Sequence, residues 1–561
     1  MYLNPLKGLL LVSLLNIGEI HAASDSVHFD WFEYEGKDVA FSDPVPEGSF
    51  QNPILAGFYP DPSMCRVEDD FYMVTSTFAF WPGVPIFHSQ DLVNWEQIGH
   101  VLDRPSQLDN IGDKVSESIF APTIRHHDGV FYMITTAVQG INNFYVTATG
   151  PAGPWSDPIL LPWVDGIDPS FFFDDDGRVY ITHNGLPPQR ESLYEGHRAV
   201  WLWEIDMESG EPIGEGKIIV NGGVDLSEEP VWIEAPHIFK RGDWYYLTCA
   251  EGGTSQNHSQ VIFRAKSLGD EWIAWEENPI LTQRDLSPDR PNPIDAAGHA
   301  DFVQLENGDW WASFLAVRPY EGGFYGTGRE TFLLPVEWTE DDWPIILPAG
   351  QEVPWTLPKP DLAPSEVSMP TTGNFSIREE FDGDELGMEW ITLRTPVHDW
   401  SSLEEKAGFL SIDPLAVELS ELDNPSWLCR RIQHATYSAS SSLLAPAPGV
   451  EAGVALLIRE DHYFFVGIQY VNDEYVVFLE KADGGEGQIV VQVPLPELKE
   501  GEALVFKIEA DRSEISFKVQ TEGSGELDLA ENEDATILTT QKAWGFVGTM
   551  IGPYARLEAT E

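Results

Sequence analysis

The amino-acid sequence predicts an all-β protein in which a five-bladed β-propeller is followed by a β-sandwich. One observation is a repeat in which a polar residue, a strand, a Gly- or Asp-containing turn and an aromatic-rich strand recur every roughly 45–70 residues, as in propeller blades. The five copies open at Asp61, Ala121, Asp168, Glu234 and His299. A second is that short alternating strands and frequent Asp-Gly turns between 51 and 346 leave little room for helix.

The first 23 residues are typical of a cleavable secretory signal. Lys7 precedes an apolar run over 8–15, and two alanines close the segment. A membrane anchor is the alternative, but it would need about 20 consecutive apolar residues. Asn16 and Glu19 interrupt this run, as does His21. We therefore expect a secreted, extracellular protein.

Three regions follow this signal. Residues 24–353 are expected to form the propeller domain, with 24 to about 50 as an extended lead-in packed on it. Between 354 and 373, five prolines remove backbone donors and fix extended geometry, which predicts a linker. Residues 374–561 contain apolar and alternating runs separated by Gly- and Asp-rich turns. This pattern predicts the β-sandwich.

The composition excludes several classes of partner. The chain has 92 acidic and 32 basic side chains, a formal net charge of −60. Such a field repels phosphate backbones and anionic lipid surfaces, so we expect neither a nucleic acid nor a membrane as partner. With 42% hydrophobic residues the chain is well outside the disordered class, and a neutral ligand suits its surface best.

Cysteine usage excludes a disulfide scaffold. Only three cysteines are present, Cys65, Cys249 and Cys429, so at most one disulfide could form. Buried core thiols are the simpler interpretation. The sequence leaves the oligomeric state open.

Three of the repeat copies open with a carboxylate. In a propeller the innermost strands line a central channel, so Asp61, Asp168 and Glu234 should converge around one axis. Repulsion and desolvation there must raise at least one pKa, and a carboxyl that stays protonated near neutral pH can act as a general acid. Asp-Pro is also a common start of a turn. That alternative does not explain Glu in one blade and Ala121 in another.

Several motifs give the propeller a strong resemblance to glycoside hydrolase family 43. They are Tyr59-Pro60-Asp61-Pro62-Ser63, Ile167-Asp168-Pro169-Ser170, Glu234-Ala235-Pro236-His237 and Gly328-Arg329-Glu330-Thr331. With the C-terminal sandwich, the chain resembles the β-xylosidase and α-L-arabinofuranosidase branch. The resemblance implies an inverting mechanism with Asp61 as general base, Glu234 as general acid and Asp168 as the residue that orients the acid and tunes its pKa. Inversion places acid and base roughly 6.5–9.5 Å apart.

The same resemblance implies substrate contacts from Phe78, Phe120, His299 and Arg329. Core packing is the alternative for the two Phe rings, and an ion pair with Glu330 is the alternative for Arg329. His299 could instead be a buried hydrogen-bonded histidine or lie beside a channel cation. No cofactor is implied as a requirement, and no residue is assigned as a metal ligand. A structural Ca²⁺ in the channel near His299 stays open.

The function implied by this resemblance is a secreted inverting exo-glycosidase. It would release xylose from the non-reducing ends of small xylo-oligosaccharides, because the sandwich closes one side of the site in that branch. The near alternative is an α-L-arabinofuranosidase, since the two sugars present similar hydroxyl arrangements. A non-catalytic carbohydrate-binding propeller and a retaining hydrolase of fructosides are more distant alternatives.

Overall fold

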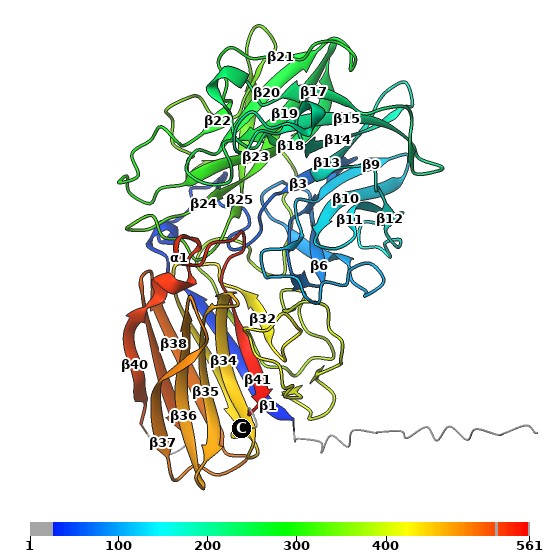
Figure 1. Cartoon of the computed structure of the whole chain (residues 1–561). Coiled ribbons are helices and arrows are strands. Elements are labelled where there is room, and N and C mark those ends of the chain that lie inside the picture. The colour runs from blue at the N-terminus through cyan, green and yellow to red at the C-terminus, as the bar shows by residue number, and fades with distance from the viewer. Residues whose placement is uncertain (1–25, 522–524, 559–561) are drawn as a thin grey trace, which may run out of the picture.

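The computed structural model describes residues 26–521 and 525–558, so the expected signal over 1–23 lies outside the described residues. Within them the chain forms two β-structured bodies, a propeller above a sandwich in the view of Figure 1. In the described ranges, helix is limited to the short turns η1 (Val39–Phe41), η2 (Pro188–Arg190), η3 (Leu226–Glu228), η4 (Ala535–Leu538) and α1 (Thr540–Ala543). None of these described helices is long and apolar enough to cross a membrane.

Five antiparallel sheets form the five predicted blades. The first blade contains β3 (Ser63–Val67), β4 (Asp70–Val74), β6 (Gly83–Ser89) and β7 (Glu96–Leu102), and the second contains β8 (Ser118–Ile119), β9 (Thr123–His127), β10 (Val130–Val138), β11 (Asn142–Ala148) and β12 (Ile159–Leu160). The third contains β13 (Gly166–Phe173), β14 (Val179–Gly185), β15 (Ala199–Asp206), β16 (Glu211–Pro212) and β17 (Lys217–Asn221), and the fourth contains β18 (Glu234–Arg241), β19 (Trp244–Glu251), β20 (Ser259–Ala265), β21 (Ile273–Ala274) and β22 (Leu281–Thr282). The fifth contains β23 (Asp295–Gln304), β24 (Trp310–Val317), β25 (Glu330–Trp338) and β26 (Pro344–Ile345). The innermost strands β3, β9, β13, β18 and β23 contact one another in this order, and β23 returns to β3. The ring closes, and the predicted propeller is confirmed.

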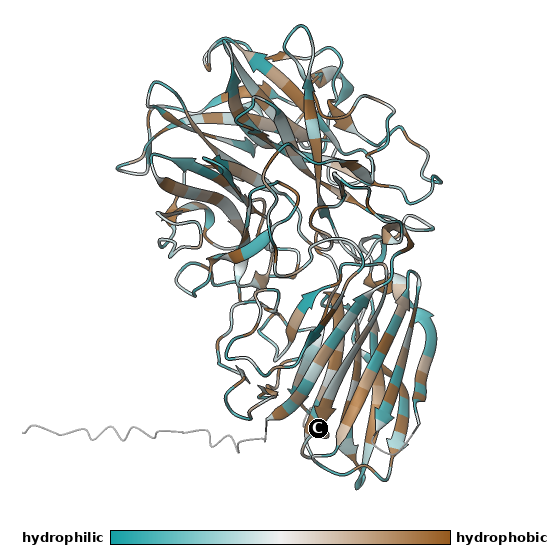
Figure 2. Ribbon diagram, turned by 180° about the vertical axis from the view of Figure 1, so that it is seen from behind, coloured by the Kyte–Doolittle hydropathy of each residue, from teal (hydrophilic) through white to brown (hydrophobic). Residues whose placement is uncertain are grey.

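The C-terminal part is the predicted sandwich of two sheets. In spatial order the first contains β30 (Ser401–Ser402), β31 (Leu410–Ile412), β1 (Val27–Gly36), β33 (Thr436–Leu444), β38 (Ala503–Asp511), β39 (Glu514–Thr521) and β40 (Leu527–Asp534), with β28 (Ser376–Glu379) also paired to β1. The second contains β37 (Gln488–Leu495), β36 (Glu474–Asp483), β35 (His462–Val471), β34 (Val450–Arg459), β41 (Met550–Leu557), β32 (Leu428–Arg431), β29 (Ile391–Leu393) and β5 (Phe80–Trp81). Apolar and polar residues alternate along many of these strands in Figure 2. Their apolar faces meet in the core, where Phe464 of β35 contacts Phe517 of β39.

The first part of the N-terminal lead-in corrects the sequence-based expectation, because β1 belongs to the sandwich. The residues after β1 do reach the propeller, where Asp38 pairs with Arg318 and Phe50 packs against Trp311. β1 pairs with β33 in a register that places Tyr34 opposite Ala439. Its buried residues include Phe29, Phe32 and Tyr34, which complete the sandwich core. The alternation of apolar residues indicates a strand but carries no information about which distant strand it pairs with.

The proline-rich linker is also partly structured. Its β27 (Thr356–Pro358) pairs with β2 (Ser49–Gln51) at the propeller. Pro358 is compatible with this pairing because β27 has a single partner strand. A strand from the propeller also joins the sandwich. It is β5, which lies between two strands of the first blade and pairs with β29. The β27–β2 ladder therefore holds the linker on the propeller, and the β5–β29 ladder ties the propeller to the sandwich.

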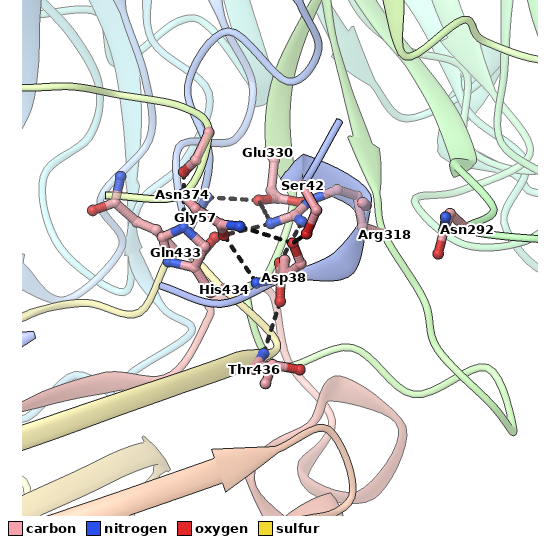
Figure 3. Close-up of polar contacts among 12 residues, drawn as sticks. Asp38, Ser42, Gly57, Asn292, Arg318, Glu330, Asn374, Gln433, His434 and Thr436 are labelled. Carbon is pink, nitrogen blue, oxygen red and sulfur yellow. Dashed lines mark hydrogen bonds and ion pairs between the residues drawn. The ribbon is translucent and has the colours of Figure 1, made fainter. Parts of the chain in front are cut away.

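A buried ionic cluster of Arg318, Glu330 and Asp38, here called the junction cluster, lies where the two bodies meet (Figure 3). Arg318 Nε and Nη2 donate to the Glu330 carboxylate at 2.6 and 2.8 Å, and its Nη1 donates to Asp38 at 2.8 Å. On the sandwich side, Arg318 also donates to the carbonyl of Gln433 at 3.0 Å, and the backbone N–H of Thr436 donates to Asp38 at 2.8 Å. The charges are thus paired and hydrogen-bonded, which buried ions require.

The junction cluster also reaches the segment that leads to Asp61. The backbone N–H of Gly57 donates to Glu330 at 2.6 Å. Glu330 begins β25 and directly follows Arg329 in the chain. The cluster therefore holds the sandwich, the Gly57 segment and the start of β25 in one arrangement.

The three cysteines are free and buried, as the composition indicated. Cys65 lies in β3, Cys249 in β19 and Cys429 in β32. Burial raises the pKa of Cys65 to about 12, so its thiol is not ionised near neutral pH. All three act as packing residues.

Candidate active site

The three predicted carboxylates come from the starts of three inner strands. Asp61 lies just before β3, Asp168 lies in β13, and Glu234 begins β18. Asp61 and Asp168 have positive φ values of 55° and 54°, and Ala235, next to Glu234, has 50°. The ladders of β13 and β18 also shift register around Asp168 and Glu234, as in a β-bulge. Bulges redirect side chains, and strained backbone of this kind gathers at functional sites.

Asp61 is buried and fully hydrogen-bonded. Arg329 Nη1 donates to Asp61 Oδ1 at 2.7 Å, Nη2 donates to Oδ2 at 3.2 Å, and the Ser76 hydroxyl donates to Oδ2 at 2.6 Å. Burial acts to raise the pKa of Asp61, but Arg329, His299 and Ser76 outweigh it, so the pKa falls below its ordinary value. Asp61 is therefore ionised near neutral pH.

The pKa values of Asp168 and Glu234 are raised, whereas that of Asp61 is lowered. The backbone N–H of Ala235 donates to Asp168 Oδ2 at 3.1 Å, so Asp168 holds the peptide next to Glu234. Burial, and then the charges of Asp168 and Asp61, raise the pKa of Glu234 to about 8. Burial and the Asp61 charge likewise raise the pKa of Asp168 to about 7. An ionised carboxylate and a protonated carboxyl in one site can take a proton from water and give one to a leaving oxygen.

Arg329 and His299 both face Asp61. Glu330 is paired with Arg318 instead, so the alternative of an Arg329–Glu330 ion pair is wrong. His299, at the positive φ of 56°, places its Nδ1 3.6 Å from Asp61 Oδ1. Burial lowers the pKa of His299 to about 4, so its imidazole is neutral near neutral pH. The structure thus brings both predicted polar residues into the carboxylate cluster.

The predicted aromatic residues form a wall that includes a ring from the sandwich. Phe78 lies 5.3 Å from Phe120 and is stacked 5.7 Å from Phe546, measured between ring centroids. Phe546 belongs to the segment between α1 and β41, and its exposed fraction is 37%, against 2% for Phe78. The Arg329 guanidinium lies 5.5 Å from the Phe546 centroid. Phe78 therefore mainly supports the wall, whereas Phe546 presents a ring face to solvent next to the carboxylates.

Sequence reasoning missed four residues of this site, namely Phe546, Ser76, Arg198 and Thr254. Phe546 is held against the propeller by a hydrogen bond from its backbone N–H to Ser116 Oγ at 3.0 Å. Arg198 acts to lower the pKa of Glu234, and Thr254 accepts a hydrogen bond from Arg329 at 3.4 Å. The run Trp544-Gly545-Phe546, two aromatic residues outside any strand pattern, is the one local signal that could have indicated the first of these.

The residues around His299 do not fit a calcium ion. The nearby carboxylate of Asp301 already binds Arg125, whose Nη1 and Nη2 donate to its two oxygens at 2.8 and 3.2 Å. Ser63 donates to the same carboxylate at 2.7 Å. A guanidinium at this place would repel a divalent cation, and the oxygens that calcium needs are taken. In the described part of the chain, no three His, Cys, Asp or Glu side chains are grouped to hold a metal.

Two family models match the chain. Residues 50–344 match the model described as glycosyl hydrolases family 43, and residues 378–560 match the β-xylosidase C-terminal concanavalin A-like domain. The first match spans the propeller and contains all three carboxylates. The second spans most of the sandwich, although it does not include β1.

Individual relatives are similar over nearly the whole chain. A non-reducing end α-L-arabinofuranosidase of Bacteroides ovatus is 37% identical over 520 residues, covering 91% of this chain and 92% of the relative. A xylosidase/arabinosidase of Butyrivibrio fibrisolvens is 38% identical over 514 residues, covering 90% and 95%. The crystal structure of a GH43_12 from a capybara gut metagenome superposes with a TM-score of 0.89 at 36% identity, covering 95% and 100%. The chain belongs to glycosyl hydrolase family 43 and is a glycoside hydrolase.

Proposed function

We propose that this protein is an inverting exo-glycosidase that releases xylose from the non-reducing ends of xylo-oligosaccharides. The observation that carries the proposal is the divergence of two carboxyl pKa values in one site. The pKa of Asp61 is lowered by Arg329, whereas burial and like charge raise the pKa of Glu234 to about 8. Pairs of carboxyl groups whose environments separate their pKa values in this way are typical of an acid and a base.

The roles follow from these protonation states. Asp61 takes a proton from the water that attacks the anomeric carbon, while Glu234 gives its proton to the departing glycosidic oxygen. The new bond forms on the face opposite the broken one, so the configuration inverts. Asp168 positions Glu234 through the Ala235 N–H, and its charge helps to keep Glu234 protonated. Arg329 and His299 hold Asp61 and are placed to contact sugar hydroxyls.

Three observations support a small terminal sugar as the substrate. The ring of Phe546 reaches the site from the sandwich and restricts it on that side. The exposed face of Phe546 and the partly buried Phe120 offer apolar surface to the C–H face of a sugar. The C-terminal model is described as a β-xylosidase domain, and one relative is named as a xylosidase/arabinosidase.

A second candidate activity is that of an α-L-arabinofuranosidase, which the name of the Bacteroides ovatus relative favours. The two sugars differ in ring size but present comparable hydroxyl groups, and discrimination between such substrates involves only a few kcal/mol. A purely sugar-binding propeller is less well supported, because binding alone would not require oppositely shifted carboxyl groups.

The site of action proposed is extracellular. The support is the N-terminal sequence over 1–23, with Lys7 before an apolar run. The net charge of −60 also suits a neutral oligosaccharide as partner better than a nucleic acid or an anionic membrane surface.

Parallel assays on two aryl glycosides test this function. We expect kcat/KM on nitrophenyl β-D-xylopyranoside to exceed that on nitrophenyl α-L-arabinofuranoside, with hydrolysis of xylobiose and almost none of polymeric xylan. An inverse ratio would assign the arabinofuranosidase activity instead. Internal fragments released from xylan would contradict exo action, and a lack of activity on every glycoside would leave a binding protein.

A further inference from the structure

Beneath the carboxylates, the channel contains a second polar layer to which each blade contributes one side chain. Its members are Ser63 on β3, Arg125 on β9, Ser170 on β13, His237 on β18 and Asp301 on β23, here called the axial network. Ser63, Ser170, His237 and Asp301 are all buried. The Ser residues of both Asp-Pro-Ser motifs and the His of the Glu-Ala-Pro-His motif therefore belong to this layer, although none of them has a part in the proposed proton transfers.

Arg125 is the centre of this layer. Its guanidinium donates to both oxygens of Asp301 at 2.8 and 3.2 Å and to Ser63 Oγ at 3.2 Å. Its Nη2 also lies 3.2 Å from His237 Nδ1, which in turn lies 2.9 Å from Ser170 Oγ. Ser63 closes the ring by donating to Asp301 at 2.7 Å. One planar cation thus links five blades by direct hydrogen bonds or through one intermediate residue.

Each outer member of the network lies two or three residues after a residue of the candidate site. Ser63 follows Asp61 by two residues and Ser170 follows Asp168 by two. His237 follows Glu234 by three, and Asp301 follows His299 by two. Because these short segments contain prolines or bulged backbone, a displacement of one member moves the linked carboxylate, or His299 in the case of Asp301, with it.

We propose that Arg125 and Asp301 are positioning residues that fix the separation of the three carboxylates by clamping the five inner strands at the axis. This proposal rests on the proposed function, in which Asp61 and Glu234 need a set distance for water to enter between them. The clamp explains why one blade contributes Arg125 where both neighbouring blades contribute Ser. It also explains why Ser recurs two residues after each Asp.

The charges of Arg125 and Asp301 cancel each other in the axial network, so removing either residue alone leaves one uncompensated charge. The other titratable groups around it are Cys65 and His237, with His299, His258, Asp61, Asp168, Glu234, Arg198 and Arg329 in or beside the carboxylate layer. Burial lowers the pKa of His237 to about 4, so it is neutral near neutral pH. Removing Arg125 would leave the Asp301 anion, and removing the Asp301 charge would leave the Arg125 cation. The two changes shift carboxyl pKa values in opposite directions.

The test compares Arg125→Met, Asp301→Asn and the double variant on a substrate that the wild type hydrolyses. We expect each single variant to lose about 10- to 100-fold in kcat with KM nearly unchanged, since small misplacement of reacting groups has effects of this size. The pH profile should move to higher pH in Arg125→Met and to lower pH in Asp301→Asn. The double variant should return toward the wild-type profile and lose less than the product of the two single losses.

A matched control is Arg556→Met, which breaks a buried cluster with Glu451 and Glu480 in the sandwich, away from the channel. It should lower Tm without moving the pH profile. If Arg125→Met does not fold, Ser170→Ala removes only the hydrogen bonds of Ser170 Oγ with His237 and Arg125, and it should lower kcat with KM nearly unchanged. Folded variants with wild-type kcat and pH profile would overturn the proposal, as would single-variant pH shifts of the same sign. Wild-type inactivity on all glycosides would instead overturn the proposed function.

Discussion

Arg329 and Asp61, 268 residues apart in the sequence, form a buried bidentate pair in which two guanidinium nitrogens donate to the two carboxylate oxygens at 2.7 and 3.2 Å. Burial alone would favour the neutral acid. The pair therefore keeps the proposed base ionised in a place where an isolated carboxylate would take up a proton.

Replacing Arg329 should move the acidic limb of the pH profile. In Arg329→Met the pKa of Asp61 rises because the largest influence opposing burial is lost, so the base becomes protonated at a higher pH than in the wild type. The acidic limb of kcat/KM should then shift to higher pH, by less in Arg329→Lys, which keeps the charge but loses the fork. An unshifted acidic limb in both variants would show that Asp61 is not the group that this limb reports.

Replacing Asp168 should move the basic limb of the pH profile to lower pH. Its charge is the second cause, after burial, of the raised pKa of Glu234. In Asp168→Asn that pKa falls, so the acid loses its proton at a lower pH and the basic limb shifts to lower pH. The limb should stay above the ordinary range of a glutamate because burial remains. A basic limb that does not move would show that Asp168 does not raise the pKa of the acid.

Replacing Glu234 should separate substrates by their leaving groups. Glu234→Gln should lose about 10³-fold on xylobiose, within the usual range for general acid catalysis. On a dinitrophenyl xyloside the loss should be much smaller, because the phenolate departs without a proton. Steady-state kinetics on both substrates check this. Equal losses would transfer the role of proton donor to another carboxyl group.

The junction cluster should contribute strongly to stability. Glu330 is fully buried and accepts hydrogen bonds from Arg318 and from the backbone of Gly57. Glu330→Gln should lower the free energy of unfolding by about 3–5 kcal/mol, the usual effect of breaking a buried ion pair. Thermal unfolding measures this, with Glu321→Gln as the control because the Glu321–Arg512 pair is exposed. Similar Tm values for the two variants would contradict a structural role for the cluster.

The sequence made the blades predictable because each blade is built from strands that are close in the chain. The turns and the alternation of apolar residues are local signals, and a repeat of five copies reinforces them. The carboxylates could be placed for the same reason, since each opens a repeat.

Contacts between distant segments were not predictable in this way. β1 pairs with β33, roughly four hundred residues later, and its alternation fits many partners equally well. Phe546 reaches the propeller site from the sandwich, so only the docked structure reveals its contact with Phe78. The ion-pair partner of Arg329 could not be predicted either, because it depends on how the two bodies pack together. Glu330, the neighbour of Arg329 in the chain, pairs with Arg318 at the junction, and Arg329 pairs with Asp61.

The most direct test of the central claim is the anomeric configuration of the first product. Proton NMR during hydrolysis of xylobiose distinguishes α- from β-xylopyranose before mutarotation mixes them. An inverting pair of Asp61 and Glu234 predicts that α-xylopyranose appears first and that the β anomer follows more slowly. If β-xylopyranose appeared first, the configuration would be retained, and the assignment of Asp61 as a base acting on water would be wrong.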